Sequence, residues 1–268
     1  IRKAGAMKMK GAAGQRRVPA DFFAALQIPL PPLAEQKRIA AILDAADALR
    51  AKRRETLAQL DTLLQSTFLD MFGDPVTNPK GWRVSTLGQE CVEIKNGRSI
   101  KQSQNAGGIP ISRIETISDG VVNPDKVGYA GLELGDAEKD ILRPGDILFS
   151  HINSTKHLCK CAIYQKDHGI LVHGMNLLRF RTGKDLNPLF LLYLLKNEKY
   201  RITLMRHENP AVNQSSIASG KLKTHMMLVP PLPLQRRFAT IVESVEQQKT
   251  RNQSQGGQSQ AADLIHSR

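Results

Sequence analysis

Residues 31–43 read PPLAEQKRIAAIL, and residues 230–242 read PPLPLQRRFATIV. The two stretches align without a gap at an offset of 199 residues, and the match extends upstream, where Gln15 aligns with Gln214 and Val18 with Ile217. A proline pair, a glutamine, an arginine, an alanine and an isoleucine shared in one register indicate an internal repeat.

Each copy predicts a strand that ends at the proline pair and a helix that follows it. Proline has no backbone N–H and its φ is fixed, so a pair of prolines ends a strand and gives the chain an extended entry. The apolar residues 26–30 and 226–229 are the two predicted strands.

The first repeat predicts a helix from about residue 34 to residue 72. Good helix formers dominate it, and no glycine or proline occurs before Gly73. Apolar residues recur at spacings of three and four and form a wide stripe over about 58 Å. Few globular domains bury so long a helix on themselves, so we expect a coiled coil.

The second helix begins with the same pattern but is polar and glycine-interrupted from Thr250 to Gln258, so we expect a truncated repeat whose far half packs poorly or frays. Two similar segments imply a pseudo-two-fold axis, which makes the helices antiparallel, within the chain or in a homodimer. We expect the stripe of residues 39–49 to meet Phe238 and its neighbours, or their symmetry mates. The predicted packing residues are Ile39, Ile42, Leu43, Ala46, Leu49, Leu57, Leu60, Phe238, Ile241, Val242 and Val245.

The chain of 268 residues carries a formal net charge of +13, which favours a polyanionic partner such as nucleic acid. A basic surface that only aids solubility is the alternative. Apolar residues make up 41% of the chain, and no apolar run approaches the roughly 20 residues of a membrane span. Three cysteines and the absence of a secretory signal favour a reduced, cytoplasmic setting.

The sequence between the repeats predicts a mixed α/β domain with short strands and polar loops. Strands are expected at 82–87, 91–95, 109–114, 146–150, 161–165 and 175–180, and a helix at 188–205. We divide the chain into a segment before the first repeat at 1–30, a long helix at 31–73, a mixed α/β domain at 74–229 and a second, truncated helix at 230–268.

Three patterns resemble catalytic or metal sites only weakly. Residues 187–190, Asn-Pro-Leu-Phe, lack the second proline of a methyltransferase motif, and we interpret them as a helix start. The triplet Glu93-Ile94-Lys95, with Asp74 upstream, resembles part of a nuclease site, but alternation on a strand explains it. Residues 157–173 hold two cysteines and three histidines at spacings atypical of structural zinc, so buried cysteines and solvated histidines are expected.

Residue types that read base edges or hold phosphates gather in three predicted loops, and we call them the three polar clusters: residues 95–102, residues 151–157, and residues 206–207 with 213–216. For any single residue a solvated loop is as good an explanation as a base contact. The candidate DNA-binding residues are Lys95, Asn96, Arg98, Ser99, Lys101, Gln102, Asn153, Ser154, Lys156, His157, Arg206, Asn213, Gln214 and Ser215.

Several segments resemble the DNA-specificity subunits of type I restriction–modification systems in content and order: Gly73-Asp74-Pro75, Gly81-Trp82 with Leu87-Gly88, Asn96-Gly97, PGDILFS at 144–150, and the closing Pro-Pro-Leu with Gln. The resemblance implies an α+β fold, in which a mixed α/β target-recognition domain is flanked by long coiled-coil helices. The family usually has two recognition domains, and the resemblance implies one complete domain here, at 74–229. It also implies that residues 1–30 are the C-terminal remnant of a preceding recognition domain and that 31–73 and 230–268 are spacer helices. Glu35 becomes Leu234 in the second copy, which weakens any role for that acid.

The resemblance also implies a non-catalytic subunit that recognises half of a bipartite DNA site. It would dock methyltransferase subunits and, through them, restriction subunits. S-adenosylmethionine, ATP and magnesium are then expected in the partner subunits, with no cofactor or metal in this chain. The alternatives are a stand-alone nucleic-acid-modifying enzyme and a basic scaffold that binds DNA without sequence preference.

Overall fold

The computed structural model describes residues 2–11, 16–103, 107–211 and 214–265, with no side chain described beyond Asn252. The chain divides into two compact units, 1–55 and 56–268, and the boundary falls inside a long helix, α3 (Leu33–Phe72). The predicted division of the chain into four segments stays a prediction. No helix among the described residues is long and apolar enough to cross a membrane.

The first unit contains α1 (Arg2–Met7), α2 (Ala20–Ala24) and the beginning of α3. Its elements follow the sequence repeat. The offset of 199 residues separates α2 from α8 (Ser219–Lys223) and the first residue of α3 from that of α9 (Leu232–Ile265). The predicted strand at 26–30 is wrong, because this segment pairs with no other strand of the described chain.

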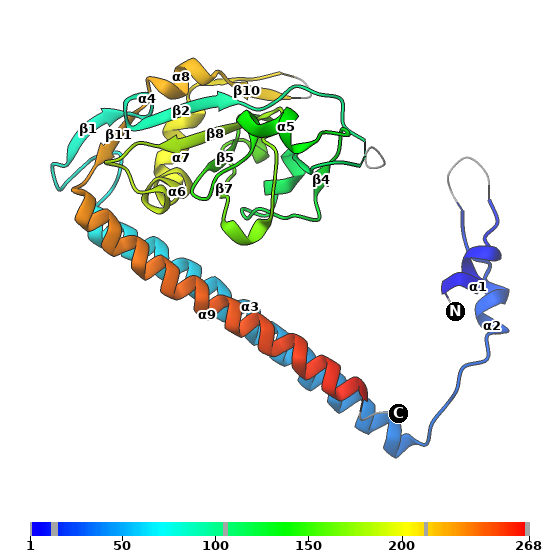
Figure 1. Ribbon diagram of the computed structural model, residues 1–268. Helices are drawn as coiled ribbons and strands as arrows, with labels where there is room; N and C mark the ends of the chain where they lie inside the picture. Colours follow the sequence, from blue (N-terminus) through cyan, green and yellow to red (C-terminus); the bar gives the residue numbers. More distant parts are fainter. Residues whose placement is uncertain (1, 12–15, 104–106, 212–213, 266–268) are drawn as a thin grey trace. The chain divides into compact units, whose positions relative to one another are not determined.

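The segment of α3 in the second unit packs antiparallel against α9 (Figure 1). The Phe68 and Phe72 rings lie 5.6 and 5.4 Å from the Phe238 ring, and Lys249 Nζ lies 2.5 Å from Asp61 Oδ1. Contacts that move toward the start of α3 therefore move toward the end of α9, as the repeat predicts.

Within the chain, Phe238 has other partners in this helix pair than the predicted ones, and the alternative, contact with symmetry mates in a homodimer, stays a prediction. Within the chain, Phe238 packs against Phe68 and Phe72, while Ile42 and Leu43 are exposed. The symmetric partner of residue 238 is residue 39 by sequence, but antiparallel pairing inside one chain brings the far end of α3 to the start of α9. The remaining exposed members of the predicted stripe are Ile39 and Leu49.

The expected decay of the second helix does not interrupt its backbone. α9 remains helical to Ile265, across Gly256 and Gly257, because two glycines weaken a helix without breaking its hydrogen bonds. Whether its far half packs poorly lies outside the described side chains.

A four-stranded antiparallel sheet forms the centre of the second unit, in the order β2-β8-β5-β7. One large core joins this sheet to the helices: Phe149 and Phe180 come from the strands, Phe190 from α6 (Pro188–Lys196), and Phe68 and Phe238 from the helix pair. The recognition domain and the helix pair therefore fold around the same apolar residues. The strands are β2 (Cys91–Asn96), β5 (Ile147–Ser150), β7 (Cys161–Ile163) and β8 (Leu177–Thr182).

The predicted helix at 188–205 is two helices, α6 (Pro188–Lys196) and α7 (Glu198–Met205). Asn197 lies between them with an extended backbone, and its side-chain oxygen accepts from Tyr200 N at 3.1 Å. Asparagine is a preferred N-cap because its short amide satisfies the free N–H groups of a first turn. The apolar run masked this stop signal.

Smaller elements complete the second unit. A pair of strands, β1 and β11, closes the domain next to the second proline pair. Each predicted strand between the repeats overlaps an observed one, although 109–114 shrinks to two residues. The remaining bounds are β1 (Arg83–Thr86), α4 (Leu87–Glu90), β3 (Ile111–Ser112), η1 (Ile114–Ile117), β4 (Val127–Gly128), α5 (Leu134–Ala137), η2 (Glu138–Asp140), β6 (Ile152–Asn153), η3 (Thr155–His157), η4 (Lys166–His168), β9 (Glu208–Asn209), β10 (Ser215–Ile217) and β11 (Met226–Val229).

Candidate nucleic-acid interface

A three-stranded sheet, β6-β10-β9, joins the second and third polar clusters. Ser215 lies opposite Asn153, and Ile217 lies opposite Glu208. The Thr155 and Ser215 hydroxyl oxygens are 3.0 Å apart. Two loops about 60 residues apart in the sequence therefore form one surface.

The first polar cluster reaches the same place through Asn96, the last residue of β2. His151 Nε2 lies 3.4 Å from Asn96 Oδ1, and His151 Nδ1 lies 3.1 Å from the carbonyl oxygen of Ile217. Burial lowers the pKa of His151, although the contact with Ile217 acts in the opposite direction. The buried His151, in the second cluster, thus contacts the first cluster and Ile217, the residue that directly follows the third.

Gly97 lets the first cluster turn away from the sheet at this point. A Cβ at Gly97 would lie 2.0 Å from the carbonyl oxygen of Gly174, so no other residue fits there without moving the backbone. Arg98 then pairs with Gly174 as an isolated bridge. The Asn-Gly pair is therefore explained by close backbone approach.

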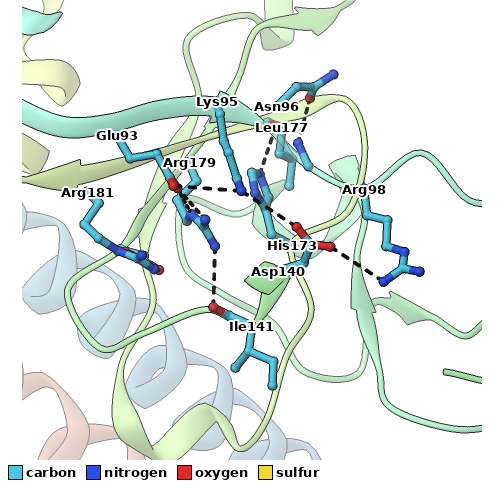
Figure 2. A network of polar contacts seen from close by, with 12 residues as sticks. Glu93, Lys95, Asn96, Arg98, Asp140, Ile141, His173, Leu177, Arg179 and Arg181 are labelled. Carbon is cyan, nitrogen blue, oxygen red and sulfur yellow. Dashed lines mark hydrogen bonds and ion pairs between the residues drawn. The ribbon is translucent and has the colours of Figure 1, made fainter. Parts of the chain in front are cut away.

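A polar network lies beneath the first cluster (Figure 2). Arg179 is 1% exposed, and its Nε donates to Glu93 Oε1 at 2.6 Å. Burial raises the pKa of Glu93, but the hydrogen bond and charge of Arg179 outweigh it and leave that pKa below its usual value. Glu93 is thus paired with Arg179, and this ion pair gives the weak nuclease pattern around Glu93 a structural explanation.

Two of the candidate DNA-binding residues, Lys95 and Arg98, face a carboxylate in this network. Lys95 Nζ lies 3.8 Å from Asp140 Oδ1, and an Arg98 guanidinium nitrogen lies 3.7 Å from Asp140 Oδ2 (Figure 2). Arg98 also donates to the carbonyl oxygen of Asp136 at 2.5 Å. Asp140 therefore restrains two cations at the end of β2 and offsets part of their charge.

Lys101 and Gln102 lie apart from this network, beside a hollow of about 310 Å³ that Arg113 and Asn176 also line. The remaining described candidates were predicted to lie in polar loops, and all but one have solvent-accessible side chains. The exception is Ser215, which is 2% exposed. Ser99, Ser154, Lys156, Arg206 and Gln214 are exposed, His157 is half-buried, and Asn213 lies outside the described residues.

Sequence reasoning missed three residues of this surface: Asp140, Thr155 and Glu208. Thr155 belongs to the second polar cluster and Glu208 lies between the two parts of the third, but neither is among the candidate DNA-binding residues. The two acids repel phosphate, so a search for basic and amide side chains passes over them. In the sequence, the only signal for these two acids is the presence of an acidic residue inside, or next to, a basic run.

The other sequence patterns have structural explanations. Asn187 is an N-cap whose side-chain oxygen accepts from Leu189 N at 2.9 Å, which confirms the predicted helix start. Cys159 and Cys161 are buried, as expected, but the expectation of solvated histidines is wrong for His173, which has no exposed surface. No group of three potential metal ligands occurs among the described residues.

The fold and the surface together define a mixed α/β domain, joined to an antiparallel helix pair, that presents polar loops at one face. The sequence matches the model of the type I restriction modification DNA specificity domain over residues 2–60 and 79–256. The chain belongs to this family.

Similar proteins carry the same family description. The putative type I restriction enzyme MjaX specificity subunit of Methanocaldococcus jannaschii is 42% identical over 63% of this chain and 40% of its own length. The EcoKI specificity subunit of Escherichia coli is 28% identical over 84% of this chain and 51% of its own length. The chain thus spans about half the length of the curated relatives it matches.

Solved structures support the fold. A chain from a study of type I R-M complex assembly and conformational transition matches with a TM-score of 0.60 at 24% identity, over 97% of this chain and 64% of its own length. The HsdS subunit of Thermoanaerobacter tengcongensis matches with a TM-score of 0.52 at 21% identity, over 94% and 62%.

Proposed function

We propose that this chain gives DNA sequence specificity to a type I restriction–modification complex. Its recognition domain binds one half of a bipartite DNA site through the three polar clusters. The observation that carries the proposal is their convergence: Asn96 meets His151, and Asn153 pairs with Ser215. Loops held by strands at one surface are a common way to place base-reading side chains.

The helices dock methyltransferase subunits and, through them, restriction subunits. The chemistry then belongs to those partners, together with S-adenosylmethionine, ATP and magnesium, and the chain itself is not catalytic. The expected location is the cytoplasm. The exposed side chains of Ile39, Ile42, Leu43 and Leu49 support a partner on α3, and a second copy of this chain is one candidate, which a mass measurement in solution tests.

Selection from a randomised duplex pool tests the DNA-binding proposal. The chain, assembled with the methyltransferase subunits of its own system, should enrich one short consensus. Recovery of random sequences would contradict the proposal and favour the alternative, a basic scaffold that binds DNA without sequence preference. Methylation or cleavage by the isolated polypeptide would instead support a stand-alone enzyme.

Two kinds of variant separate base readout from phosphate binding. Gln214→Ala should change preference at one position by about 1–3 kcal/mol, while Lys101→Ala and Lys156→Ala should weaken binding to all sequences and flatten its salt dependence. Asn153→Ala should also change preference, but the Asn153 side chain bonds to Ser150 Oγ and Ser154 N, so this variant disturbs the loop as well. Gln214 is the sharper test.

A further inference from the structure

Glu208 lies between the two parts of the third polar cluster, and the three clusters themselves contain no carboxylate. It begins β9, at the edge of the sheet that joins the second and third clusters, and it follows Arg206 and His207. Its side chain is half-buried, so part of it faces solvent on the candidate DNA surface. An acid at this place in a chain of net charge +13 calls for an explanation.

Two hydroxyl groups hold this carboxylate in position. Thr155 Oγ1 donates to Glu208 Oε1 at 2.7 Å, and the same hydroxyl lies 3.0 Å from Ser215 Oγ. Ser215 is in turn buried and held by strand pairing opposite Asn153. The Glu208 side chain is therefore oriented by groups from two other segments.

The same hydroxyls keep Glu208 ionised. Hydrogen bonds from Thr155 and then Ser215 hold the pKa of Glu208 below its usual value. Because these described partners are neutral, the carboxylate keeps its full charge. An ionised carboxylate offers about four acceptor positions, so capacity remains for a donor from outside the protein.

DNA offers few donors that such a group can accept from. Phosphates repel it, and guanine O6 and thymine O4 are acceptors in the major groove. Adenine presents its N6 amino group beside the N7 acceptor, which a carboxylate also avoids, whereas cytosine presents the N4 amino group alone. A fixed carboxylate therefore selects cytosine and rejects the other three bases.

We propose that Glu208 accepts a hydrogen bond from the N4 amino group of one cytosine in the major groove, with Thr155 and Ser215 as positioning residues. This inference rests on the proposed function and names one element of its target. Glu208 is thus a specificity-determining residue within a basic surface.

Selection from a randomised duplex pool tests the inference with the assembled complex. The wild-type protein should select a consensus that contains a cytosine, and Glu208→Gln should relax the preference at that position by about tenfold. Thr155→Val should relax the same position less. Glu243→Gln removes an equal charge from exposed α9 and should leave the consensus unchanged.

A chemical probe keeps the test independent of protein folding. Consensus DNA that carries pyrimidin-2-one, which lacks the N4 amino group, in place of each cytosine in turn should bind the wild type about tenfold less tightly at one position. A wild-type consensus with no loss at any such position, and with Glu208→Gln no different from Glu243→Gln, would overturn the role of Glu208. Failure of the wild type to select any consensus would overturn the proposed function itself.

Discussion

Gln36 and Gln235 occupy the same position in the two repeats and make the same hydrogen bond. Each Nε2 donates, at 2.7 Å, to the carbonyl oxygen of the first proline in its pair, Pro31 or Pro230. This bond closes the turn between the prolines and the helix. The repeated glutamine is therefore explained at atomic level.

Only the second glutamine also ties the helix to the recognition domain. Gln235 has no exposed surface; its Oε1 accepts from Asn187 N at 2.8 Å, and its Nε2 approaches the Asp185 carbonyl oxygen at 3.2 Å. We expect Gln235→Leu to lower the free energy of unfolding by about 3 kcal/mol, because it leaves buried backbone groups without partners. Chemical denaturation measures this change.

Gln36→Leu is the matched control for that experiment. Gln36 is half-buried and makes the proline bond, so its loss should cost less than about 1 kcal/mol. Equal losses in the two variants would show that the contacts with residues 185 and 187 contribute nothing.

Asp140 provides a second prediction at the scale of single residues. Because it restrains Lys95 and Arg98, Asp140→Asn should free both cations and tighten binding to random DNA about threefold to tenfold at low salt. The exposed Asp136 lies four residues earlier, in α5, and Asp136→Asn should have a smaller effect. A titration that finds the two variants alike would assign the effect to net charge alone.

At the scale of elements, the helix pair depends on an aromatic cluster. Phe238 has no exposed surface and packs against Phe68, Phe72 and Tyr193. Phe238→Ala should lower the free energy of unfolding by about 3–5 kcal/mol, since it removes a large buried ring. Ile42→Ala, at a side chain that is 54% exposed, should cost less than about 1 kcal/mol in the isolated chain. Similar losses would mean that Ile42 is covered in solution.

The elements differ in how well the sequence predicts them. α3 was found to within one residue because its start and stop signals, a proline pair and Gly73, flank an uninterrupted pattern. The strand at 26–30 was wrong because pairing, not local sequence, makes a strand. The break at Asn197 was hidden by the apolar residues on both sides of it.

The candidate site was predictable as regions but not as contacts. The three clusters were named from residue type, yet their meeting depends on the short strands β6, β9 and β10, which local sequence does not reveal. Asp140 joins the first cluster although it lies about 40 residues further along the chain. Such long-range pairs require the fold.

At the scale of the whole molecule, the repeat has a structural counterpart in both units. Three features follow the 199-residue offset: the equivalent helices α2 and α8, the matching starts of α3 and α9, and the bonds of Gln36 and Gln235. Equivalent helices that run antiparallel are what a pseudo-two-fold axis requires. Under the proposed function, such symmetry places two recognition domains at opposite ends of the helices.

The length of the helices should then set the spacing between the two half-sites on DNA. α3 contains 40 residues and spans about 60 Å. Seven residues inserted between Glu55 and Thr56 should add about 10 Å and keep the apolar seam in phase. The insertion leaves the contacts of Phe68 and Phe72 with Phe238 in place. At about 3.4 Å per base pair, the spacer within the methylated site should grow by about three base pairs.

Mapping the DNA sites methylated by the assembled complex measures this spacer. The matched control replaces residues 49–55 with the inserted heptad without lengthening the helix, and its spacing should stay unchanged. A longer spacer in the insertion variant alone would show that helix length sets the half-site distance, since only the distance between the helix ends differs. An unchanged spacer in a variant that still assembles and methylates would mean that the half-site distance is set elsewhere, even though the antiparallel packing holds.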